Sequence, residues 1–137
     1  MKTNDRRKAP LGQGGVGDSV GLVAFDADDT LWDCQGAFRA VEHALAELLS
    51  PYAEADEVLR VLAATEHRNM PLTGYGAKAF TLSMVEAAIG VSRGRVGGEE
   101  IGEVLRLGRR LMELPATPLP GVEATLGRVR EVVSCPV

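Results

Sequence analysis

The sequence predicts an α/β fold in which one core strand precedes a mostly helical insertion, so that the chain as a whole is predominantly helical. Val20 to Phe25 form a short, continuous apolar run, which is typical of a strand buried on both faces. Apolar residues then recur at helical spacing through most of the chain. Asp26 and Asp28 follow the run directly, at the end where parallel strands bind ligands.

Composition limits the class of protein. A length of 137 residues, a net charge of −4 and 45% hydrophobic residues indicate one small globular domain with an aliphatic core. The mild acidity and the scattered basic residues argue against nucleic acid as a partner. No apolar run approaches a membrane span, and the basic N-terminus lacks the apolar segment of a secretory signal. We therefore expect a cytoplasmic location, with Cys34 and Cys135 as free thiols.

The first third of the chain predicts a lead-in, a strand with an acidic loop and a helix. Residues 1–18 are polar and rich in Gly and Pro, which predicts a disordered lead-in. Residues 19–33 hold the predicted strand and the acidic loop behind it. The first helix follows, with Asp33 as its expected N-cap. Its apolar face consists of Phe38, Val41, Leu45 and Leu48. Ser50 and Pro51 end this helix.

The remaining chain predicts four further helices, separated by Gly and Pro. The second ends before Pro71, and the third runs from about Ala77 to Ile89 with Gly90 as its stop. Apolar faces are formed by Val58, Leu59 and Leu62 in the second helix, Phe80, Met84 and Ala87 in the third, Ile101, Val104, Leu105, Gly108, Leu111 and Met112 in the fourth, and Val122, Leu126, Val129 and Val132 or Val133 in the fifth.

The sequence predicts only one strong strand beside several helices, which is unusual for an α/β fold. A lone strand leaves its amide and carbonyl groups without partners, and burying them unpaired is costly. The last residues, VVSCPV, are the only other strand candidate, and they are weak. The chain therefore has the pattern of the front part of a larger α/β domain.

The acidic loop suits phosphoryl transfer. Asp26 could attack phosphorus and form an aspartyl phosphate. Asp28 could reach the leaving oxygen, protonate it and later deprotonate the attacking water. Mg²⁺ would offset the repulsion between carboxylates and phosphate. The alternative is a solvated turn whose acidic residues cap the following helix.

The stretch VAFDADDTLWD resembles the first motif of the haloacid dehalogenase superfamily, a hydrophobic strand followed by Asp-x-Asp-x-Thr-Leu. This resemblance implies that Asp26 is the nucleophile and a Mg²⁺ ligand. It implies that Asp28 is the general acid and base and that its backbone carbonyl also binds Mg²⁺. Thr30 would steady the loop. Asp29 stands where many members have Gly.

The same resemblance implies a domain organisation. Residues 34–118 are similar to the helical cap of the superfamily, and 119–137, with PLPGVEATLGRV, to the helix that returns to its Rossmann-like core. The later motifs, a Thr or Ser, a Lys and an acidic pair, have no counterpart, although Ser134 could imitate the Ser. The chain is therefore interpreted as truncated, by a frameshift or as a fragment, with a missing C-terminal half or a partner that supplies it.

The leading hypothesis is a Mg²⁺-dependent phosphohydrolase that acts on a small phosphorylated metabolite. The alternative is a catalytically inactive helical binding module or a gene fragment. His67, Arg68 and Asn69 could touch substrate from the cap, and a polar helix end is an equal interpretation. Substrate and oligomeric state stay open.

Overall fold

The computed structural model describes residues 21–133. The expected lead-in, Val20, Ser134 and Cys135 lie outside this range. The chain divides into two units, one formed by Trp32–Thr117 and the other, within the described residues, by 21–31 and 118–133. The helical unit begins and ends within two residues of the predicted cap, residues 34–118. Its role as a cap stays a prediction.

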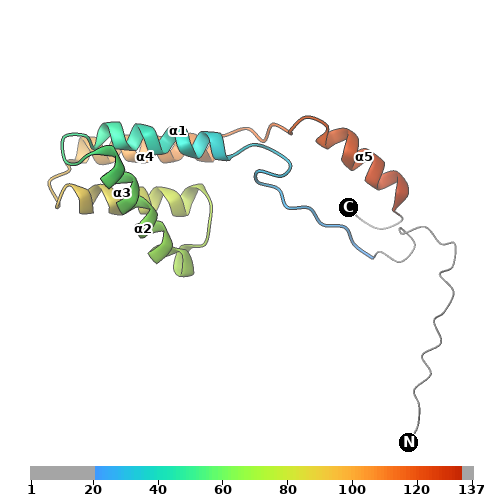
Figure 1. The fold of residues 1–137 in the computed structure, drawn as a ribbon, viewed down its shortest axis with the longest axis horizontal. Helices are drawn as coiled ribbons and strands as arrows, with labels where there is room; N and C mark the ends of the chain where they lie inside the picture. The colour runs from blue at the N-terminus through green and yellow to red at the C-terminus, as the bar shows by residue number, and fades with distance from the viewer. Residues whose placement is uncertain (1–20, 134–137) are drawn as a thin grey trace, which may run out of the picture. The chain divides into compact units, whose positions relative to one another are not determined.

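The helical unit contains four helices (Figure 1). They are α1 (Gln35–Leu48), α2 (Ala55–Thr73), α3 (Ala77–Val91) and α4 (Gly98–Met112). Helix α3 packs against α2 and α4, and α1 packs against the same two helices. These four contacts form a closed ring, so each helix can turn an apolar face toward a common interior.

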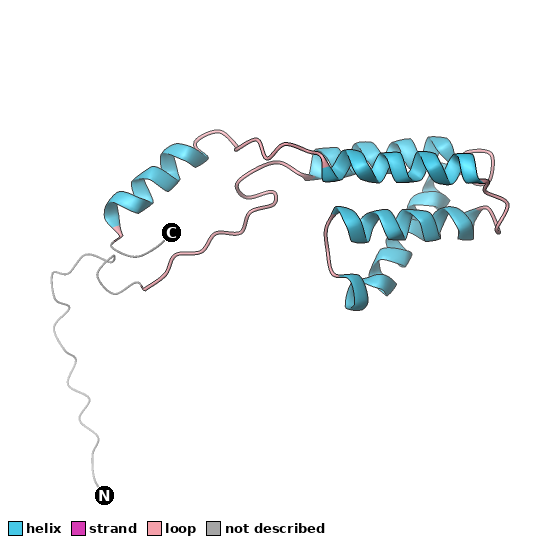
Figure 2. Cartoon of the chain, turned by 180° about the vertical axis from the view of Figure 1, so that it is seen from behind, coloured by secondary structure: helices cyan, strands magenta, loops and turns pink. Residues whose placement is uncertain are grey.

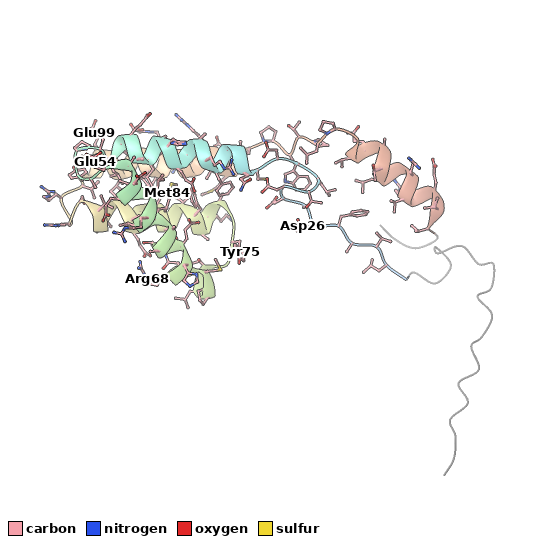
Figure 3. All side chains as sticks on the ribbon, in the orientation of Figure 1. Asp26, Glu54, Arg68, Tyr75, Met84 and Glu99 are labelled. Atoms are coloured by element: carbon pink, nitrogen blue, oxygen red, sulfur yellow. The ribbon has the colours of Figure 1, made fainter. Side chains whose placement is uncertain are left out.

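The core of this unit is aliphatic, as the composition predicts. Helix α3 is the most apolar of the described helices and buries Phe80, Met84, Ala87 and Ala88. Met84 lies among the helices in Figure 3. The other core residues are Val41, Leu45, Ala46, Leu49, Val58, Leu62, Val104, Leu107 and Leu111. The rings of Phe38 and Phe80 meet edge to face, with centroids 5.1 Å apart. The apolar faces predicted for α1 and α3 are thus confirmed.

Two predicted helix ends are wrong. Helix α2 continues through Pro71 to Thr73, because a proline in the last turn removes only one hydrogen bond of a helix that is about to end. The Gly74 amide still donates to the Met70 carbonyl at 3.0 Å. Helix α3 includes Gly90 and ends instead at Val91, with Ser92 as its C-cap residue. A glycine with helical neighbours on both sides can remain helical at a modest entropic cost.

The start of α1 also differs in detail from the prediction. Cys34, rather than Asp33, is the residue before the first helical position. The Asp33 carboxylate nevertheless accepts a hydrogen bond from the Gly36 amide at 3.4 Å. Asp33 therefore satisfies one of the amides that a helix start leaves without an internal partner, from one position earlier than expected.

The predicted core strand does not form within residues 21–133, and the α/β core is not confirmed. Residues 22–27 have no strand pairing (Figure 2). Leu22 and Phe25 are exposed, and helix α5 (Val122–Val132) buries none of its residues. A strand needs a neighbour to satisfy its backbone groups, and the described residues provide none. None of the described helices is both long and apolar enough to span a bilayer.

Helices α3 and α4 approach each other closely where Thr81 faces Gly108. A Cβ built at Gly108 would lie 2.8 Å from the Cβ of Thr81, which is too short for two side chains. Thr81 is buried, and its hydroxyl donates to the Ala77 carbonyl at 2.6 Å. Its β-branched side chain therefore has little freedom to move away. Glycine at 108 sets the distance between the two helices.

We expect Gly108→Ala to lower the free energy of unfolding by about 1–2 kcal/mol, since the overpacking cost exceeds the gain in helix propensity. Gly102→Ala, in the same helix with no heavy atom within 4 Å of the new Cβ, is the control and should stabilise by about 0.5–1 kcal/mol. Chemical denaturation followed by circular dichroism measures both. Equal stability of the two variants would contradict the close approach.

Glu66 of α2 lies in an environment that disfavours its charge. Partial burial, and then the nearby charge of Glu42 on α1, raise the pKa of Glu66 above its ordinary value of 4.5. A raised carboxyl pKa means that the folded state holds its proton more tightly than the unfolded state. The associated stability is present at low pH and is lost as the pH rises through the folded-state pKa.

Glu66→Gln should therefore become more stable than the parent as the pH rises from about 4 to 7. At the acidic end of this range, the two proteins should have the same free energy of unfolding. Urea titrations across this range measure the difference. Glu42→Gln removes only the second cause, so its effect should be smaller. A difference that is constant with pH would show that Glu66 ionises as it does in the unfolded chain.

Candidate functional site

A tight turn places the acidic residues. The amides of Thr30 and Leu31 both donate to the Ala27 carbonyl, at 3.2 and 2.7 Å. Asp29 adopts a left-handed conformation with φ of 57°, which Asp tolerates better than most residues. The chain therefore reverses immediately after Asp28. Many members of the superfamily that this motif resembles have Gly at the position of Asp29. A positive φ explains this preference, because Gly adopts it without strain.

Thr30 contacts Asp26 directly. Its hydroxyl donates to Oδ2 of the Asp26 carboxylate at 2.8 Å. This is a hydrogen bond to a charged group, and it fixes the orientation of the carboxylate relative to the turn. The contact is the one that a loop-supporting Thr30 requires. Asp26, Asp28 and Thr30 are all exposed, so solvent and solutes reach them (Figure 3 labels Asp26).

The oxygen ligands at this turn suit Mg²⁺. Mg²⁺ in proteins is often held by one or two carboxylates, with waters and substrate phosphate completing its shell. Asp26 and Asp28 are two residues apart on one turn and offer that set. Within residues 21–133, no group of three or more His, Cys, Asp or Glu side chains gathers. The carboxylate oxygens of Asp26 and Asp28 are donors of the kind that Mg²⁺ prefers.

The polar residues near the end of α2 have structural partners. Asn69 is buried, and its amide donates to the Ser83 hydroxyl at 3.2 Å. Arg68 donates to the Glu86 carboxylate at 3.1 Å. Both contacts join α2 to α3. The side chain of His67 is exposed. These contacts favour the interpretation of 67–69 as a polar helix end.

Sequence reasoning missed a polar cluster at the far end of the helical unit. The Tyr52 hydroxyl donates to Oε1 of Glu100 at 2.8 Å, and Oε2 of Glu100 accepts from the Gly97 amide at 2.8 Å. Hydrogen bonding by Tyr52 is the main cause that lowers the pKa of Glu100, and the same bond raises the pKa of Tyr52. The two residues are 48 positions apart, so no local pattern could pair them.

Comparison with solved structures places this chain beside a known hydrolase. The chain is similar to a haloacid dehalogenase-like family hydrolase from Xanthomonas campestris, with 32% sequence identity and a TM-score of 0.77. The match covers 85% of this chain and 48% of that protein, so the chain spans about half the length of the solved structure. No protein-family model and no curated protein matches the chain.

Proposed function

Since the chain is a member of the haloacid dehalogenase superfamily, as its similarity to the Xanthomonas campestris hydrolase over 85% of its length indicates, we propose that it provides the nucleophile loop of a Mg²⁺-dependent phosphohydrolase acting on a small phosphomonoester. The hydrogen bond from Thr30 to Asp26 is the main structural support for this proposal. A solvated turn does not need its first carboxylate held, whereas a nucleophile does, because attack depends on orientation.

The proposed reaction has two steps. A carboxylate oxygen of Asp26 attacks phosphorus, the bond to the leaving oxygen breaks, and Asp28 gives that oxygen its proton. Asp28 then takes a proton from water, which attacks the aspartyl phosphate and releases phosphate. Thr30 engages Oδ2 of Asp26, so we assign the attack to Oδ1. Each residue regains its starting protonation state at the end of the cycle.

The carboxylate of Asp26 and the backbone carbonyl of Asp28 are the groups that we expect to hold Mg²⁺. When bound, the ion would offset the negative charge of the carboxylates and the phosphoryl oxygens. The protein's own contribution is to fix the direction of Asp26 through Thr30 and to keep Asp28 next to it through the turn at Ala27.

A helical binding module is the second candidate function. It is favoured by one observation, namely that Trp32–Thr117 form a separate unit with their own buried core. The two functions are compatible, because a unit that folds around its own core can bind a ligand whether or not the Asp26 loop is active.

The first experiment joins this chain to the complementary half of the Xanthomonas campestris relative, in place of the segment that it matches. Asp26→Asn should abolish turnover of every phosphomonoester, since neither attack nor the aspartyl phosphate is possible. Asp28→Asn should slow an alkyl phosphate by about 10²–10⁴ and slow p-nitrophenyl phosphate much less, because nitrophenolate leaves without a proton. Steady-state rates on the two substrates measure both ratios.

Asp33→Asn is the matched control, because an amide at this position can still accept the hydrogen bond from the Gly36 amide. It should keep the parent rates. Retained activity in Asp26→Asn, or equal slowing of both substrates by Asp28→Asn, would contradict the assigned roles.

A second experiment tests Thr30 in the same chimaera. Thr30→Val keeps the shape but removes the hydroxyl that donates to Asp26, and it should lower kcat by roughly 10-fold or more. Thr30→Ser keeps the donor and should recover most of the rate. If Ser and Val are equally slow, the threonine acts through packing and not through its hydrogen bond.

A further inference from the structure

A polar hollow opens at one end of the helical unit. Its volume is about 470 Å³, within the range of roughly 300–1,000 Å³ that holds small molecules. Its wall includes Tyr52, Glu57, Arg93 and Arg95. These residues lie near the loops that follow α1 and α3, at the end opposite to that where the chain enters α1 and leaves α4. The residues that line the hollow all belong to the helical unit, whereas the Asp26 turn belongs to the other unit.

The charge in this wall is positive on balance. Glu57 is paired with Arg60 at 2.7 Å, and the Tyr52 hydroxyl is engaged by Glu100. Within residues 21–133, Arg93 and Arg95 form no ion pair with a carboxylate. An unpaired guanidinium in a hollow attracts an anion, and its planar fork matches the two oxygens of a carboxylate or phosphate.

Arg95 is held in place before any ligand binds. Its guanidinium carbon lies 5.6 Å from the centre of the Tyr52 ring, and its Nε donates to the Ser92 carbonyl at 3.0 Å. Tyr52 is fixed in turn by Glu100, which caps the start of α4. This preorganisation lowers the entropic cost of binding.

Arg93 occupies a backbone position that favours glycine. The amide of Gly94 donates to the Ile89 carbonyl at 2.9 Å, and the amide of Arg93 donates to the Gly90 carbonyl at 3.1 Å. This pattern ends α3 with a left-handed residue, which is most often Gly. Here the residue is Arg93, with φ of 54°, and only the next residue is glycine. An arginine in this conformation carries backbone strain that a glycine would avoid.

We propose that this hollow binds the phosphate or carboxylate group of a small metabolite, with the guanidinium groups of Arg93 and Arg95 as its ligands. Tyr52 and Arg95 form the rigid side of the site. Arg93 is the second arm, and both arginines are exposed. This binding does not depend on the Asp26 turn or on Mg²⁺.

The test is an NMR titration of the full chain with inorganic phosphate and, separately, with succinate, in the absence of Mg²⁺. Saturable shifts should appear at the amides of Gly90 and Gly94 and at Nε of Arg95. Arg95→Gln should weaken binding at least about tenfold, the loss of one charge-assisted contact. Arg106→Gln, which removes an equal charge from the surface of α4, is the control and should bind as the parent does.

Arg93→Gly distinguishes a loss of ligand binding from a loss of folding, because it should affect the two in opposite directions. It should weaken binding at least severalfold and raise the melting temperature by a few degrees, because glycine relieves the positive φ. Asp26→Asn should leave the titration unchanged. The proposal is overturned if the parent binds neither probe, if Arg106→Gln weakens binding as much as Arg95→Gln does, if Arg93→Gly binds as the parent does, or if Asp26→Asn abolishes the shifts.

Discussion

The helical unit depends on the close packing of α3 against its neighbours, and at the Thr81–Gly108 contact this packing leaves no room for a side chain on α4. Helix α3 supplies the bulky Phe80 and Met84 to the core, so α2 and α4 must approach it closely to exclude water. Gly108 permits the approach of α4, and Asn69 with Ser83 joins α2 to α3. The ends of the same helices then position the polar hollow.

The two units differ in how far their apolar side chains are buried. Trp32–Thr117 bury a continuous aliphatic core, with no unsatisfied buried side-chain polar atom among the described residues. Residues 21–31 and 118–133 meet through the hydrogen bond from the Leu119 amide to the Leu31 carbonyl, at 2.8 Å. They expose apolar side chains such as Leu22 and Val132.

The turn that carries the candidate site forms from contacts between residues close in sequence, but the proposed reaction also requires groups from outside this turn. The turn at Ala27, the positive φ of Asp29 and the contact between Thr30 and Asp26 all form within six residues of sequence. Phosphoryl transfer also needs positive charge around the phosphoryl oxygens, which a turn of carboxylates does not provide. The proposed reaction therefore relies on groups beyond this turn, which is why a chimaera with the relative is the informative protein.

The sequence alone determined the helices, the apolar faces of α1 and α3 and the motif that placed Asp26, Asp28 and Thr30 together, because helical periodicity and turn chemistry act over a few residues. The faces predicted for α4 and α5 were only partly right, since Leu105, Met112 and Val132 are exposed. The end of α3 and the continuation of α2 through Pro71 were missed, since packing outweighs a single Gly or Pro. The strand was predicted from its apolar run, yet strand formation depends on a neighbour. Only the tertiary structure joined Tyr52 to Glu100 and Arg95, because residues far apart in the chain meet through helix packing, which leaves no local pattern in the sequence.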